Sequence, residues 1–110
     1  MEIIISTLED KKDLVRCNNA VDCVQDFKGK KVKVYGFIIY NKADKDGEIK
    51  TVTAIKMADG FITSISPTIR DSVETIIAAY DENEICEGID IVIKSKKSKG
   101  GRDFFYLDLA

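Results

Sequence analysis

Alternating apolar and polar residues from position 30 onward predict a chain built mainly from β-strands. The first such strand, residues 30–40, contains two interleaved rows of side chains. One row is Lys31, Lys33, Tyr35, Phe37 and Ile39, and the other is Val32, Val34, Gly36, Ile38 and Tyr40. Val32, Val34 and Ile38 are expected to face the core. A glycine in mid-strand predicts a bend or bulge, which would turn every later side chain to the opposite face.

Turn signals divide the next segment into a three-stranded meander. Residues 41–47 are rich in turn formers and end in Asp46-Gly47, a hairpin signal. A second strand is predicted over residues 48–58. The dipeptide Asp59-Gly60 then predicts a tight turn into a third strand over residues 61–65.

A helix and a second hairpin follow the meander. Ser66 and Pro67 suit the N-cap and the first position of a helix. Its predicted buried stripe consists of Ile69, Val73, Ile76, Ile77 and Tyr80. A fourth strand over residues 89–94, a tip at 98–101 and a fifth strand over 102–109 complete the pattern. In the fifth strand we expect Phe105, Leu107 and Leu109 to face the core and Phe104, Tyr106 and Asp108 to face away.

The first 27 residues are expected to form an extension that packs on this framework. Ser6-Thr7-Leu8-Glu9 has the spacing of a capping box, which predicts a short helix over residues 8–16. A short strand or a turn of helix is expected over residues 20–27. Phe27 is expected to pack against the framework.

The element order of three strands, one helix and two strands predicts a mainly β fold. It is the order of a five-stranded, OB-fold-like Greek-key barrel with one helix between strands three and four, spanning residues 1–110 as one domain. Barrels of this class bind oligonucleotides on the face of strands two and three, flanked by the loops between strands one and two and between strands four and five.

Composition narrows the function classes. With 45% apolar and 33% charged residues among 110, a single folded domain with a modest core is expected. No apolar run approaches a membrane span, and we see no secretory leader, so a cytoplasmic protein is expected. Histidine is absent, and the three cysteines lack metal-ligand spacing and are read as reduced, mostly buried thiols. We therefore expect no enzyme activity, no cofactor and no metal.

Positive charge is concentrated in two segments although the net charge is −2. The candidate phosphate contacts are Lys31, Lys33, Lys42, Lys50 and Lys56 in the first two strands and their loop, and Lys94, Lys96, Lys97, Lys99 and Arg102 in the last hairpin. Lysines meet phosphates, whereas exposed rings stack on bases. The candidate stacking residues are Tyr35, Tyr40, Phe61, Phe104 and Tyr106. The alternatives are ordinary solvated lysines, and an aromatic cluster that the N-terminal segment covers.

The order of several short motifs resembles the single-stranded DNA-binding proteins of phi-29-type phages and related Gram-positive phages and mobile elements. These motifs are Thr51-Val52-Thr53-Ala54-Ile55, Ala58-Asp59-Gly60, Ser64-Ile65-Ser66, Ser98-Lys99-Gly100 and Phe104-Phe105 with alternating leucines. They cover residues 30–110. The resemblance implies an OB-fold protein that coats and protects displaced strands during phage DNA replication without sequence preference. It assigns a DNA contact to Tyr40, while Phe61 precedes a position where that family has a tyrosine.

Single-stranded DNA is thus the expected partner, in the cytoplasm of a host cell, with phage replication proteins as further candidates and no membrane. A monomer or a weak homo-oligomer is expected. Two alternatives stay open: an RNA-binding OB domain, and a phage accessory module that uses the acidic segment 71–90 to bind another protein.

Overall fold

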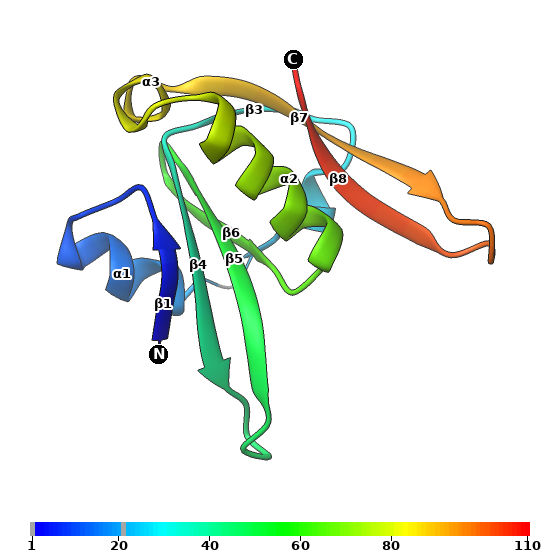
Figure 1. Ribbon diagram of the computed structural model, residues 1–110, viewed down its shortest axis with the longest axis horizontal. Helices are drawn as coiled ribbons and strands as arrows, with labels where there is room; N and C mark the ends of the chain where they lie inside the picture. The colour runs from blue at the N-terminus through cyan, green and yellow to red at the C-terminus, as the bar shows by residue number, and fades with distance from the viewer. Residues whose placement is uncertain (1, 21) are drawn as a thin grey trace.

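Two mainly antiparallel sheets joined by one broken strand form the framework of the protein (Figure 1). The computed structural model describes residues 2–20 and 22–110. Sheet A runs in the order β1 (Glu2–Ser6), β4 (Gly36–Ala43), β5 (Ile49–Met57), β6 (Gly60–Ser64) and β2 (Asp22–Cys23), the last pair being parallel. Sheet B runs in the order β3 (Lys31–Val34), β7 (Ile89–Lys97) and β8 (Asp103–Leu109). The predicted mainly β class is confirmed.

The predicted first strand is split at Tyr35 and serves both sheets. Its first part, β3, pairs with β7, and its second part, β4, pairs with β5. A Cβ at Gly36 would meet the Leu8 side chain at 2.5 Å, so a glycine suits the close approach of the N-terminal segment. After the break, odd-numbered rather than even-numbered side chains face the main core, as expected from a glycine in mid-strand. Phe37 is therefore in the main core, and its expected place beside the lysines is wrong.

Two helices, not the single one predicted, connect the third and fourth predicted strands. The first, α2 (Pro67–Ala79), begins after Ser66 as expected. The second, α3 (Glu82–Glu87), begins with a capping box in which the Glu84 amide donates a hydrogen bond to Asp81 Oδ1 at 2.8 Å. Gly88, with φ of 104°, ends α3 in a backbone conformation that favours glycine. The Asp81-x-x-Glu84 spacing is the signal for α3 that the sequence interpretation missed.

The N-terminal segment contains a strand that was not predicted. Ile3, Ile4 and Ile5 lie in β1, which pairs with β4 at the edge of sheet A. The first helix, α1 (Lys11–Asn18), starts later than expected because Asp10, rather than Ser6, caps it and accepts a hydrogen bond from the Lys12 amide. A short 3-10 turn, η1 (Val24–Phe27), follows β2, in agreement with the expected strand or helical turn.

Neither sheet closes into a barrel, because β2 pairs with the outer edge of β6 and α2 lies against the free edge of β8 (Figure 1). The Thr68 hydroxyl donates to the Phe105 carbonyl at 2.7 Å, and the Leu107 amide donates to Ser72 Oγ at 3.2 Å. Side chains of α2 thus satisfy backbone groups that a strand partner would otherwise take. The barrel expected from the element order is therefore not formed as a closed sheet.

The main core lies between the two sheets and α2. Ile69, Val73 and Ile76 of the predicted stripe are buried in it, and Ile77, Tyr80, Phe27 and Phe105 pack against it, as expected. Leu109 does not: the residue is 48% exposed and lines an open pocket beside Thr75 and Ala79 of α2. Of the three cysteines, Cys17 is buried and Cys86 exposed. Within the described residues, no helix is both long and apolar enough to cross a membrane.

Candidate nucleic-acid interface

The outer face of sheet B collects six of the predicted contact residues. Register places Lys94 opposite Tyr106 and Lys96 opposite Phe104, so these four side chains alternate on one side of the β7–β8 pair. Lys31 pairs with Val92 and Lys33 with Asp90, which puts both lysines of β3 on the same side. This surface, named the basic face here, consists of Lys31, Lys33, Lys94, Lys96, Phe104 and Tyr106.

The two rings of the basic face contact each other and a cation. The Phe104 and Tyr106 ring centroids are 6.5 Å apart at an interplanar angle of 46°. Lys96 Nζ lies 5.0 Å from the centre of the Tyr106 ring, within cation–π range. Both rings are half-buried, so each presents apolar surface to solvent. This is the facing predicted for them.

Exposed carboxylates partly neutralise this surface. Lys94 Nζ lies 2.8 Å from Asp108, and Lys31 Nζ lies 3.7 Å from Asp90. The hydrogen bond between Lys94 and Asp108 raises the pKa of the lysine and lowers the pKa of the carboxyl. Exposed pairs of this kind are weak, and a phosphate can replace the carboxylate. Lys33 and Lys96 form no ion pair with any described residue.

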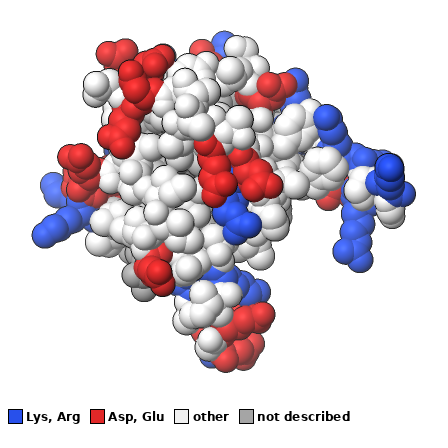
Figure 2. Space-filling model, viewed as in Figure 1, with Lys and Arg blue, Asp and Glu red and all other residues white. Residues whose placement is uncertain are grey.

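The tip of the β7–β8 hairpin extends the basic face away from the body of the protein (Figure 1). It carries Lys97, Lys99 and Arg102, and Figure 2 shows it as a blue projection. The Ser98 amide donates to the Arg102 carbonyl at 2.8 Å, and Gly101 takes a positive φ of 79°, which closes the turn.

The β4–β5 hairpin is less basic than the sequence interpretation assumed. Lys42 and Lys50 stand opposite each other in the ladder, but Lys50 Nζ lies 3.9 Å from Asp44. Asp46 and Glu48 add further negative charge at the tip, which Figure 2 shows as mainly red. Lysine content alone overstated the positive potential of this loop.

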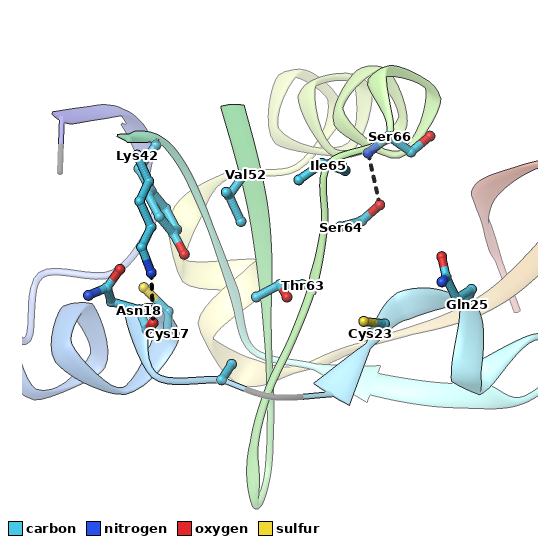
Figure 3. Close-up of a pocket in the computed structure, with 12 residues that line it drawn as sticks. Cys17, Asn18, Cys23, Gln25, Lys42, Val52, Thr63, Ser64, Ile65 and Ser66 are labelled. Atoms are coloured by element: carbon cyan, nitrogen blue, oxygen red, sulfur yellow. Dashed lines mark hydrogen bonds between the residues drawn. The ribbon is translucent and has the colours of Figure 1, made fainter. Parts of the chain in front are cut away.

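A groove of about 470 Å³ crosses the outer face of sheet A (Figure 3). Val52, Thr63 and Ile65 line its floor, and Lys42 and Ser66 stand toward its two ends. Asn18 at the end of α1 also lines it, and the buried Oδ1 of that side chain has no hydrogen-bond partner among the described residues. Lys42 was predicted as a contact, but the sequence interpretation missed Asn18, Val52, Thr63, Ile65 and Ser66, although Val52 shares the side of the ladder that carries Tyr40 and Lys42.

Three predicted contacts, Tyr40, Phe61 and Lys56, are covered by or paired with α1, although Tyr40 also lines the groove. Tyr40 and Phe61 are 2% and 6% exposed and form a second apolar cluster with Cys17, Ile38 and Ala54. Lys56 Nζ pairs with Asp13 at 3.0 Å. Burial raises the pKa of Tyr40 to about 12. For these two rings the structure corresponds to the alternative of a cluster covered by the N-terminal segment.

Tyr35 adjoins the basic face only at Lys33, because a Cβ built at Gly88 would lie 2.6 Å from Lys33 Cε and 3.0 Å from Tyr35 Cε1. It is half-buried at the break between β3 and β4 and lines a shallow pocket with Leu8, Lys56 and Cys86. Its amide donates to the Lys56 carbonyl at 2.9 Å, which ties the break to β5. This position separates Tyr35 from the Phe104–Tyr106 pair.

No group of three or more potential metal-ligating side chains is assembled within residues 2–20 and 22–110. No protein-family profile, no curated protein and no solved structure matches the chain.

Proposed function

We propose that the protein binds single-stranded nucleic acid, with DNA as the substrate, through the basic face and the β7–β8 tip. The observation that carries this proposal is the alternation of Lys94 and Lys96 with Tyr106 and Phe104 across one ladder. Cations beside half-exposed rings offer a strand both phosphate neutralisation and base stacking, independent of sequence. The groove on sheet A, with Lys42 at one end, is a second place where bases can be held.

An OB-like architecture is part of the same proposal. Because β3 and β4 derive from one broken strand, the predicted strands run in the order three, two, one, four, five across the two sheets. Pairing of strand three, now β6, with strand five, now β8, would complete a barrel. Since β2 occupies the outer edge of β6 and α2 lies against β8, the fold is read as an OB barrel opened at that pair, with the groove on the face of strands two and three.

The biological role follows from the resemblance described above. Coating of strands displaced during phage DNA replication needs affinity without sequence preference, in the cytoplasm of a host cell. RNA binding is the competing possibility on the same surface, and a protein-interaction module is the competing class.

A titration with oligo(dT) tests the function directly. The chain has four tyrosines and no tryptophan, so tyrosine fluorescence reports binding without a label. With about four phosphate contacts, the slope of log affinity against log salt is expected near −3. Lys96→Ala should weaken binding and reduce that slope by about 0.7, whereas Lys11→Ala, on the exposed start of α1, provides a charge-matched control.

Three results would count against the proposal: no binding at low salt, binding that ignores salt, or equal affinity for duplex and single strand. Competition between oligo(dT) and oligo(U) separates DNA from RNA. A stoichiometric protein partner that survives nuclease treatment, together with no oligonucleotide binding, would favour the interaction module.

A further inference from the structure

Helix α1 covers half of the face of sheet A that carries the groove. Ladder register places nine side chains on this outer face: Ile38, Tyr40, Lys42, Lys50, Val52, Ala54, Lys56, Phe61 and Thr63. Ile65, which follows the end of β6, lines the groove beside them. Ile38, Ala54 and Phe61 are buried beneath α1, and Val52, Thr63 and Ile65 line the open groove. Tyr40 belongs to both, because it is buried in the same cluster and also lines the groove. Cys17 and Asn18 of α1 form the boundary, because both also line the groove (Figure 3).

The contacts of α1 with this face match those that a single strand would make. The Asp13 carboxylate pairs with Lys56 at 3.0 Å, where a phosphate could sit. The Asn18 carbonyl accepts a hydrogen bond from Lys42 Nζ at 3.5 Å. Apolar groups of Leu14 and Cys17 pack in the cluster that holds the Tyr40 and Phe61 rings, which are surfaces suited to bases. One helix therefore occupies four of the predicted contacts.

The attachment of α1 is small and partly polar. The helix has eight residues, and helices of this length are marginal without tertiary packing. Its buried side chains are Asp13 and Cys17, and the charge of Asp13 must be offset by Lys56. The partnerless Asn18 Oδ1 is a further polar cost in the docked state. These features favour a segment that can leave its site over a permanently packed core element.

We propose that α1 is a displaceable cover that competes with single-stranded nucleic acid for the outer face of sheet A. A single nucleic-acid strand bound in the groove would displace α1 from sheet A. Its bases and phosphates would then contact Tyr40, Phe61 and Lys56. The inference rests on the proposed function, because it describes regulation of the same binding activity. Apparent affinity is then the intrinsic affinity reduced by the fraction of molecules whose face is uncovered.

Cys17 reports the position of the cover. The residue is 1% exposed, so alkylation of its thiol requires α1 to leave the sheet. In the full chain with Cys23→Ser and Cys86→Ser, saturating oligo(dT) is expected to accelerate alkylation of Cys17 at least several-fold. Duplex DNA of the same length, which does not supply free bases, is expected to leave the rate unchanged.

Substitutions that loosen α1 should tighten binding. Leu14→Ala removes half-buried apolar contact with the cluster and is expected to lower the apparent Kd about tenfold. Val15→Ala, next to it on the exposed side of α1, is the matched control and should not change Kd. Asp13→Asn, which releases Lys56, should lower Kd a few-fold, while Glu9→Gln controls for its change in charge.

The outcomes separate this inference from the function on which it rests. If wild-type protein binds oligo(dT) but Cys17 reactivity is unchanged and neither Leu14→Ala nor Asp13→Asn tightens binding, the cover is refuted and the function stands. If no variant, including those with a loosened α1, binds oligo(dT) at low salt, both are refuted. Accelerated alkylation together with tighter binding of both loosened variants supports the cover.

Discussion

The ion pair between Lys56 and Asp13 joins two residues of unequal burial. The Lys56 side chain is 33% exposed and that of Asp13 is 7% exposed. Lys56→Met therefore leaves a buried carboxylate without a partner, whereas Asp13→Asn leaves a lysine that can reach water. We expect the first change to cost about 1–3 kcal/mol in the free energy of unfolding and the second less than about 1 kcal/mol. Urea unfolding of both variants measures the difference, and equal costs would contradict this account.

Phe104 and Tyr106 are expected to be the main stacking residues of the basic face. Truncating either ring to alanine should reduce oligo(dT) affinity by about 1–3 kcal/mol. The double variant should lose less than the sum, because the rings contact each other. Leu109→Ala, on the opposite side of the same strand and exposed, is the matched control for loss of an apolar side chain. An equal effect of Leu109→Ala would remove the basis for stacking.

The side of the sheet on which a side chain lies could be predicted from sequence only within an unbroken strand. Phe104 and Tyr106 lie in an unbroken ladder, so alternation placed them correctly with Lys94 and Lys96. Tyr40 follows a break, and its environment depends on α1, which comes more than twenty residues earlier in the chain. Alternation, corrected for a break at Gly36, indicates which side of the sheet Tyr40 occupies. It carries no information on whether a helix such as α1 covers that side.

At the level of elements, α1 couples the ionisation of Tyr40 to folding. Burial holds the pKa of Tyr40 at about 12, against 10.0 for a free tyrosine. The unfolded chain thus releases this proton at lower pH than the folded protein, so stability is complete below pH 10 and falls as pH rises towards 12. Burial also raises the pKa of the neighbouring Cys17 thiol, which acts in the same direction.

An alkaline titration followed by phenolate absorbance should therefore show one late tyrosine. Tyr40→Phe keeps the ring but has no ionisable group, so the late step should vanish and sensitivity of stability to pH between 10 and 12 should diminish. Tyr80→Phe, which packs against the main core, serves as the control. Ionisation of Tyr40 near pH 10 would show that its ring is not held beneath α1.

Elements with their own end signals were predictable, and those that depend on a partner were not. Ser66-Pro67 fixed the start of α2 from sequence. The strand β1 has five residues and exists through pairing with β4, so a short apolar run could not establish it. For the first helix two capping candidates, Ser6 and Asp10, lie four residues apart, and the Ser6 hydroxyl instead forms a local turn with Leu8.

At the scale of the whole molecule, the element order predicted which strands neighbour each other but not the closure of the sheet. Because the first predicted strand is broken into β3 and β4, the five predicted strands lie in two sheets. Their order is still three, two, one, four, five. Closure would require β6 and β8 to pair, but β2 occupies the outer edge of β6 and α2 lies against β8. Which element occupies each edge is a matter of packing and not of local pattern. The structure assigns the edge of β8 to α2 through Thr68 and Ser72.

Ser72 should accordingly matter more for stability than its position on a helix suggests. Its hydroxyl donates to the Thr68 carbonyl and accepts from the Leu107 amide, so Ser72→Ala leaves a backbone N–H of β8 without a partner. We expect a loss of about 1–3 kcal/mol in the free energy of unfolding. Thr75→Ala is the matched control, because the Thr75 hydroxyl makes the same kind of bond to Asp71 but contacts no strand.

Hydrogen exchange locates the effect of Ser72→Ala within the fold. Because α2 holds the root of the β7–β8 hairpin, the variant should lose protection at the Leu107 amide and along β8, while β4 and β5 keep theirs. If the hairpin also carries the nucleic-acid contacts, a looser root should weaken oligo(dT) binding through the entropy of ordering it again. Loss of stability without altered protection in β8 would show that α2 does not act as the closing element between the two sheets.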